Sequence, residues 1–315
     1  MKTIFIGTLC AFAASFALLL ILKPLLKRLK AGQYILGYVK EHKNKNGTPT
    51  MGGLAFIAAL IIVGACALGF SDGRANLTFA ITAGFMFVGF LDDFLKIYHK
   101  ENEGLKPYQK ILFQLAIASV AAAYCYINKY TVLYVPFGGG FSFDITWGII
   151  PLIIFIFLAT VNCVNLTDGL DGLAGGTSCA YLFVMGLLLS IQKTQNLSVL
   201  SFVAVGAVAA FLVFNGNKAS IFMGDTGSLA LGGLISCLSV FSGNSLYIPL
   251  VGIMFVISGI SVIVQVIYYK RTRKRVFLMA PVHHHFQMKG YSESKISYAY
   301  FILTALVGII CLIFV

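Results

Sequence analysis

The sequence predicts an all-α polytopic membrane protein with about ten transmembrane helices. Of its 315 residues, 59% are hydrophobic and only 11% are charged. Apolar runs of roughly 20 residues recur from end to end, and each is long enough to cross a hydrocarbon core about 30 Å thick. The strict alternation of apolar and polar residues that a membrane β-barrel needs is absent, so helices, which satisfy their own backbone groups, are expected.

We expect a single integral-membrane domain over residues 1–315, with spans at about 3–22, 52–70, 76–95, 110–128, 147–164, 173–191, 198–214, 228–242, 246–268 and 296–314. Gly252 and Gly259 suggest a bend in the ninth span, and the glycine-rich outward loop 134–144 suggests a short hairpin. The seven cysteines show no CxxC spacing and lie mostly inside apolar spans, which favours packing over a zinc site or disulfides.

The distribution of basic residues predicts the orientation. Four alternate loops hold 19 of the 23 Lys and Arg, namely 23–50, 96–110, 215–227 and 270–295. By the positive-inside rule these loops are cytoplasmic, and with ten spans both termini then lie outside. The net charge of +12 therefore indicates topology and affinity for anionic lipid or substrate, and not for nucleic acid, because no soluble basic domain is present.

Five of the eleven acidic residues lie at the cytoplasmic edges of predicted spans: Asp92, Asp93, Asp168, Asp171 and Asp225. The adjacent pair Asp92 and Asp93 ends the apolar run FVGFLDDFLK. A solvated helix end is the plain alternative, but a helix C-terminus disfavours acidic groups. Two partly desolvated carboxylates side by side indicate a divalent cation, a lysine or a proton to be moved.

Two glycine-containing motifs place further polar groups at the same edge. In VNLTDGLDGLAGG (164–176), Asn165, Asp168 and Asp171 would share a face of a helix or, in a loop, the glycines would let the backbone approach a ligand; an ordinary turn is the alternative. In FMGDTGSLALGG (222–233), Asp225 precedes a new span. It is either the N-cap of that helix or a residue that holds a metal beside an anion-binding helix start.

The last cytoplasmic loop contains MAPVHHHF (279–286). Zinc is a poor explanation for three successive histidines, because no further cluster of His or Cys completes a tetrahedron. Hydrogen bonding to phosphate oxygens explains them better, with a tolerant interfacial loop as the alternative.

Lysines 96, 106 and 110 flank the Asp92–Asp93 pair, and lysines at such positions are snorkelling anchors by default. Lysines, histidines, carboxylates and glycine-rich loops on one membrane face are nevertheless the set that phosphoryl transfer requires. No GxxxxGK[ST] or GxGxxG loop is present, so a bound nucleotide would be held in some other way.

The chain resembles the phospho-N-acetylmuramoyl-pentapeptide transferases in its length, in its ten-span plan and in five motifs that occur in the same order. The motifs are TPTMGG (48–53), DDFLK (92–96), NLTDGLDGLAGG (165–176), FMGDTGSLALGG (222–233) and MAPVHHHF (279–286). This family belongs to the polyprenyl-phosphate N-acetylhexosamine-1-phosphate transferase superfamily. The sequence departs from the family pattern after the histidines, where Gln287 and Tyr291 stand in a stretch that is often acidic and tryptophan-bearing.

The resemblance implies an enzyme of peptidoglycan synthesis in the bacterial inner membrane, with its active site on the cytoplasmic face. Such an enzyme transfers phospho-MurNAc-pentapeptide from UDP-MurNAc-pentapeptide to undecaprenyl phosphate, giving lipid I and UMP, and it requires Mg²⁺. The resemblance also implies a homodimer.

The resemblance assigns a role to each matching residue. Asp92 would act as base or orienting group for the lipid phosphate with Asp93 as its partner, Asp225 would bind Mg²⁺, and Lys96 and Lys110 would contact phosphates. The uridine would be framed by Asn215, Asp171 and a stacking Phe222. The rest of the cleft would be lined by Asn162, Asn165, Asp168, Lys45 and Thr50, and His283 and His284, supported by His285, would serve the diphosphate or the acceptor.

A phosphate monoester has its second pKa near ~6, so the lipid phosphate is mostly dianionic at neutral pH and needs positioning more than deprotonation. We therefore favour direct attack of the lipid phosphate over a covalent aspartyl-phosphate. A sibling enzyme that uses UDP-GlcNAc is the nearest rival, and the histidine loop argues against it. An ion-coupled transporter would need acids near mid-span and broken half-helices, whereas the acids here lie at one edge.

Overall fold

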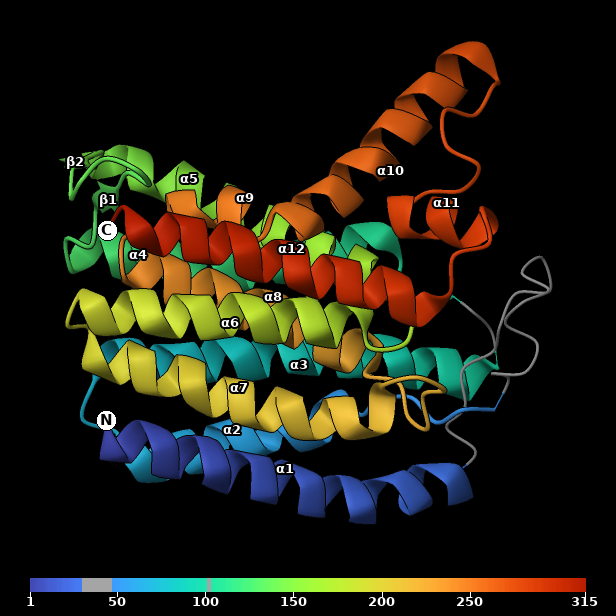
Figure 1. Ribbon diagram of the computed structural model, residues 1–315, viewed down its shortest axis with the longest axis horizontal. Helices are drawn as coiled ribbons and strands as arrows, with labels where there is room; N and C mark the ends of the chain where they lie inside the picture. The colour runs from blue at the N-terminus through green and yellow to red at the C-terminus, as the bar shows by residue number, and fades with distance from the viewer. Residues whose placement is uncertain (30–46, 101–102) are drawn as a thin grey trace.

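The computed structural model describes residues 1–29, 47–100 and 103–315, and nearly all the regular structure in these ranges is helical (Figure 1). The helices are α1 (Lys2–Arg28), α2 (Gly53–Leu68), α3 (Gly73–His99), α4 (Pro107–Ile127), α5 (Ile149–Thr167), α6 (Leu173–Ile191), α7 (Gln195–Asn215), α8 (Gly224–Phe241), α9 (Ile248–Val251), α10 (Ile253–Thr272), α11 (Val282–Met288) and α12 (Glu293–Ile313).

The predicted fold class is confirmed. Nine helical segments in the described ranges are long and apolar enough to cross a membrane, and the shorter apolar helix α2 accounts for the remaining predicted span. Most span ends agree within a few residues, but α1 continues beyond its predicted end to Arg28. Both termini lie at one end of the bundle, as an even number of spans requires (Figure 1).

The ninth span is broken, as its glycines suggested. Helix α9 ends at Val251, Gly252 has non-helical dihedral angles, and α10 then leaves the bundle at an angle (Figure 1). A Cβ atom at Gly252 would lie 2.7 Å from the carbonyl oxygen of Ile248, so the backbone there leaves no room for a side chain.

Loop 134–144 forms the expected hairpin. Strands β1 (Val132–Tyr134) and β2 (Ser142–Asp144) pair antiparallel, with Leu133 opposite Phe143. The hairpin lies at the same end of the bundle as the termini (Figure 1).

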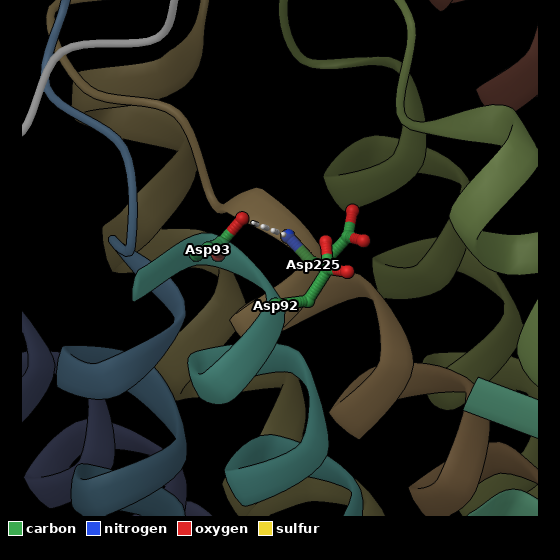
Figure 2. Close-up of side chains that lie close together, drawn as sticks. All are labelled: Asp92, Asp93 and Asp225. Atoms are coloured by element: carbon green, nitrogen blue, oxygen red, sulfur yellow. Dashed lines mark hydrogen bonds between the residues drawn. The ribbon is translucent and has the colours of Figure 1, made fainter. Parts of the chain in front are cut away.

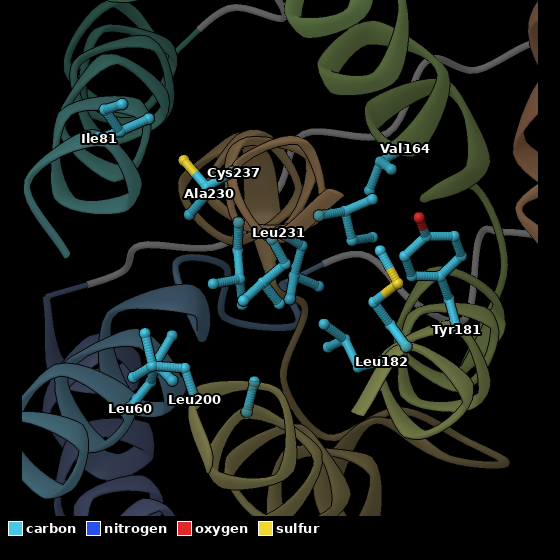
Figure 3. Packing of buried hydrophobic residues seen from close by; sticks show 14 of the residues in the cluster. Leu60, Ile81, Val164, Tyr181, Leu182, Leu200, Ala230, Leu231 and Cys237 are labelled. Carbon is cyan, nitrogen blue, oxygen red and sulfur yellow. The ribbon is translucent and has the colours of Figure 1, made fainter. Parts of the chain in front are cut away.

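Helix α8 lies at the centre of the bundle. All of its residues from Thr226 to Phe241 are buried, and Figure 3 shows Ala230, Leu231 and Cys237 surrounded by side chains of the neighbouring helices. Its buried serines donate to carbonyl oxygens of their own helix, as Ser236 does to Gly232, so these hydroxyls are satisfied without water. Helices such as α1 and α12 instead expose most of their apolar side chains, as a lipid-facing helix requires.

Small residues allow α3, α2 and α8 to approach closely, as is typical of membrane helices. A Cβ atom at Gly89 of α3 would collide with the backbone of Asp225 and Thr226, and one at Gly53 of α2 would collide with the backbone of Gly227. The start of α8 is therefore held against two other helices by backbone contact.

We expect Gly89→Ala to destabilise the protein by about 1–3 kcal/mol, because the methyl group cannot enter without moving the start of α8. The midpoint of thermal unfolding in detergent measures this loss. Gly84→Ala on the same helix is the matched control, because a Cβ atom there would make only ordinary contact with Ile117 at 3.4 Å. Equal midpoints for the two variants would show that the close approach at Gly89 does not matter.

Candidate active site

Three carboxylates from two helices meet at the end of the bundle opposite the termini. Asp92 and Asp93 lie near the end of α3, and Asp225 lies in the first turn of α8. One oxygen from each carboxylate lies within 4.8 Å of the others (Figure 2). The sequence separates these groups by more than 130 positions, and the packing of α3 on α8 brings them together.

Asp93 caps the N-terminus of α8. Its carboxylate accepts hydrogen bonds from the backbone N–H groups of Asp225 (3.2 Å, Figure 2) and Thr226 (3.0 Å) and from the Thr226 hydroxyl (2.7 Å). The alternative of Asp225 as the N-cap is therefore wrong: Met223 holds that position and the first amides are satisfied from α3. Hydrogen bonds to charged groups contribute roughly 1.5–3 kcal/mol each, so Asp93 fixes where Asp225 lies.

Two lysines neutralise much of the charge. Lys96 Nζ lies 2.5 Å from Asp92 Oδ2 and 3.3 Å from Asp225 Oδ2. Lys110 Nζ, from α4, lies 3.0 Å from Asp92 Oδ1 and 2.6 Å from Asp225 Oδ2. Three carboxylates thus face two ammonium groups, and Asp225 Oδ2 is shared between both lysines.

Asp92 is enclosed. Its side chain is 0% exposed, whereas that of Asp225 is 17% exposed. The loop before α4 passes directly over it: the Leu105 N–H donates to Asp92 Oδ1 at 2.8 Å, and a Cβ atom at Gly104 would lie 2.5 Å from the same oxygen. Only a glycine leaves room for this loop to cover the carboxylate.

Asn165 completes the surroundings of Asp225. Its Nδ2 donates to Asp225 Oδ1 (2.9 Å) and to the Ser228 hydroxyl (2.8 Å). Asn162, one turn earlier on α5, instead pairs with Gln114 of α4, whose oxygen accepts from Asn162 Nδ2 at 2.7 Å. Asn162 therefore braces α5 against α4, while Asn165 points to the acidic cluster.

The segment after α5 is a loop, not a continued helix. Helix α5 ends at Thr167, and Gly172 adopts φ +71°. Asp171 is buried and accepts from the Ala219 N–H at 2.8 Å, and Asn215 accepts from the Gly172 N–H at 3.1 Å and donates to the Ile221 carbonyl at 2.9 Å. Loop 168–172 is thereby joined to the segment that leads into α8.

Asp168 begins this loop. Its burial and then the charges of Asp225, Asp93 and Asp171 raise the pKa of Asp168 to about 8. The environment thus favours the protonated form of this carboxyl more than that of an exposed aspartate.

Phe222 and Thr50 lie where the TPTMGG motif meets the start of α8. The Phe222 N–H donates to the Pro49 carbonyl and the Phe222 carbonyl accepts from the Gly52 N–H, both at 2.8 Å. Thr50 is buried, and a Cβ atom at Gly224 would lie 2.6 Å from its hydroxyl oxygen. Lys45 lies outside the described residues.

The three histidines lie on α11 and have different surroundings. His283 is fully buried, neither ring nitrogen has a hydrogen-bond partner among the described residues, and burial, followed by His284, lowers its pKa to about 3. His284 Nδ1 lies 3.0 Å from Gln287 Oε1, and His285 Nδ1 accepts from the Leu278 N–H at 3.1 Å. A Cβ atom at Gly169 would collide with His283 and lie 2.9 Å from His284 Nε2, so these two rings border loop 168–172.

Several contributors were not predicted from the sequence. Gln114 pairs with Asn162, and Gln287 contacts His284. Glu293, in the first turn of α12, accepts from the Asp171 N–H at 3.0 Å, and Gly104 lies against Asp92. A lone glutamine in an apolar span, such as Gln114, is a signal that was available, because polar groups in lipid are rare without a partner. Nothing local in the sequence indicates that Gly104 folds back onto Asp92.

Comparison with known proteins identifies the family of the chain. Residues 75–243 match glycosyl transferase family 4, and residues 45–57 match signature 1 of the phospho-N-acetylmuramoyl-pentapeptide-transferases. The chain is 44% identical to the phospho-N-acetylmuramoyl-pentapeptide-transferase of Clostridioides difficile (strain 630), over 92% of this chain and 91% of that protein. It is 40% identical to the enzyme of the same name from Bacillus subtilis (strain 168), over 98% and 97% of the two chains. The chain therefore belongs to the phospho-N-acetylmuramoyl-pentapeptide-transferase family of membrane transferases.

Proposed function

We propose that the protein transfers phospho-MurNAc-pentapeptide from UDP-MurNAc-pentapeptide to undecaprenyl phosphate, giving lipid I and UMP, with Mg²⁺ as cofactor. The observation that supports this most directly is the group of three carboxylates and two lysines at one end of membrane-length helices. Such a group suits phosphoryl transfer at the surface of a bilayer, where a polyprenyl acceptor must stay.

The residues present fit Mg²⁺, which prefers oxygen ligands and few protein carboxylates. Asp225 is the residue we assign to the ion, because it is the most exposed of the three carboxylates and its Oδ1 is already oriented by Asn165. An ion held by Asp225 would supply positive charge that offsets the negative charge of the phosphate groups.

Lys96 and Lys110 would bind and orient phosphate oxygens. Both ammonium groups lie between Asp92 and Asp225 and keep 28% and 23% of their side chains exposed, so they can turn toward an incoming phosphate without leaving the cluster. In the reaction, an oxygen of the lipid phosphate attacks the sugar-linked phosphorus. The bond from that phosphorus to the oxygen of the UMP moiety breaks, and UMP leaves with the electron pair.

Asp92 and Asp93 are better suited to positioning than to nucleophilic attack. Asp92 is enclosed, with both oxygens engaged by lysines and one also by the Leu105 N–H. The oxygens of Asp93 accept three hydrogen bonds from the start of α8. A carboxylate that attacked phosphorus would have to give up these contacts, which favours direct attack by the lipid phosphate.

The nucleotide and sugar would lie toward loop 168–172 and the segment before α8. We assign Phe222 to stacking on the uracil, Asn215 and Asp171 to the uridine, and His283 and His284 to the diphosphate or the acceptor, with His285 supporting them. His285 is turned toward Leu278, which fits a supporting role. Thr50, Asn162, Asn165 and Asp168, with Lys45, would line the remainder of the cleft.

The proposed orientation places this end of the bundle in the cytoplasm of a bacterial cell, at the inner membrane. Nineteen of the 23 basic residues lie in loops assigned to this side, which favours that orientation by the positive-inside rule. We also propose a homodimer, which cross-linking in native membranes would test.

We expect purified protein to release UMP from UDP-MurNAc-pentapeptide and undecaprenyl phosphate in the presence of Mg²⁺. Asp225→Asn should lower this rate at least ~100-fold, because the ligand that positions the ion is weakened. Asp144→Asn, in the exposed hairpin at the opposite end, is the matched control and should retain the rate. Equal rates with UDP-GlcNAc would instead indicate the sibling activity, and no release from either donor would overturn the proposal.

We expect no exchange of labelled UMP into UDP-MurNAc-pentapeptide when the lipid acceptor is absent, since direct attack forms no enzyme-bound phosphate. Radiolabelled UMP, unlabelled donor and Mg²⁺ are sufficient for the measurement, and exchange with lipid present serves as the positive control. Exchange without lipid, or phospho-MurNAc-pentapeptide trapped on Asp92 or Asp93, would establish a covalent intermediate.

A further inference from the structure

Two polar side chains that follow the histidines connect α11 to the start of α12. Gln287 is buried, and its Oε1 lies 3.0 Å from His284 Nδ1. Its Nε2 donates to Glu293 Oε1 at 3.4 Å. Glu293 stands in the first turn of α12, and its other oxygen, Oε2, accepts from the backbone N–H of Asp171 at 3.0 Å. The contacts therefore form a continuous chain from His284 to loop 168–172.

The donor and acceptor atoms fix the direction of each hydrogen bond in this series of contacts. An ionised carboxylate only accepts hydrogen bonds, so Gln287 must present Nε2 to Glu293 and Oε1 to the histidine. An amide oxygen also only accepts, so His284 must carry a proton on Nδ1. The remaining nitrogen, Nε2, is the one that borders Gly169 in loop 168–172.

The same carboxylate also anchors the loop. Glu293 holds the N–H of Asp171, and Ser297, one turn later on α12, donates to the Asp171 carbonyl at 2.8 Å. Glu293 at the start of α12 thus contacts loop 168–172 directly and the ring of His284 through Gln287.

We infer that Gln287 and Glu293 are positioning residues that hold His284 with its proton on Nδ1 and its Nε2 toward loop 168–172. This inference rests on the proposed function, in which His284 serves the diphosphate or the acceptor. A ring held in one tautomer presents the same nitrogen to the reactants in every turnover, and the amide and carboxylate behind it stabilise positive charge on the ring when Nε2 takes up a proton.

Stabilisation of α12 is the simpler explanation of Glu293, because an acidic residue in the first turn of a helix interacts favourably with the helix dipole. The side chain, however, extends to Asp171 and Gln287 on other segments, and the capping contact of α12 comes from Ser292, whose hydroxyl accepts from the Lys295 N–H. Ser292→Ala therefore tests helix stability without touching the chain of contacts.

The decisive experiment measures UMP release for Gln287→Leu. This substitution keeps the bulk of the side chain but removes the hydrogen bonds to His284 and Glu293. We expect kcat to fall about 10-fold or more with little change in KM for UDP-MurNAc-pentapeptide, as for other residues that orient a functional ligand. In a His284→Ala background the same substitution should have no further effect, whereas Ser292→Ala should leave kcat unchanged. A Gln287→Leu rate equal to that of the unchanged protein, or an equal loss in both backgrounds, would overturn the inference.

The tautomer provides a readout that does not depend on activity. With ¹⁵N-labelled histidine, and with the His284 signal assigned by its loss in His284→Ala, the unchanged protein should show the proton on Nδ1. In Glu293→Gln the Gln287 amide can rotate by half a turn and present its NH₂ group to His284. The His284 proton should then move from Nδ1 to Nε2. A His284 proton on Nε2 in the unchanged protein would overturn the inference even if UMP release is normal. If the tautomer is as expected but no UMP is released, the result would count against the proposed function alone.

Discussion

The hydrogen bonds between Asp93 and the first amides of α8 are the interaction on which the rest of the site depends. The first N–H groups of α8 have no partner within their own helix, and a carboxylate from α3 satisfies two of them. This contact holds Asp225 beside Asp92 and orients the peptide that carries it. Because Gly89 leaves no gap between the two helices, the relative position of the carboxylates is set by backbone contact as well as by hydrogen bonds.

The charges of the cluster explain why it lies at the edge of the bundle. A carboxylate in the middle of the bilayer would be costly even when paired, whereas at the edge the long side chains of Lys96 and Lys110 reach the acids from segments that also contact water. The same location suits both proposed substrates. A polyprenyl tail stays in the bilayer, a nucleotide sugar stays in water, and only the interface is accessible to both.

The sequence was sufficient for the helices and for the candidate residues, but not for the contacts among them. Spans could be predicted because twenty apolar residues have few alternatives to a membrane helix. Asp92, Asp93 and Asp225 could be selected because carboxylates are rare beside lipid. The structure shows that Asp93 caps α8 and that Asp225 does not cap its own helix. This arrangement depends on the packing of α3 on α8, which no local sequence pattern encodes. Gly104 was missed for the same reason, since it acts on a residue of another segment, whereas Gln114 could have been selected as a polar residue inside an apolar span.

The site divides into two parts that different elements hold. The ends of α3, α4 and α8 position the carboxylates and lysines, while α11 and the start of α12 position the histidines and loop 168–172. Asn215 joins the two parts, because it bonds both to Gly172 in that loop and to Ile221 in the segment leading to Asp225. The side chains of Asn215 and Asp171 therefore connect the two parts of the site. In the proposed reaction, the alignment of the attacking and leaving oxygens matters more than any covalent step by the protein, so such a connection would keep the groups assigned to the substrates in a fixed relative position.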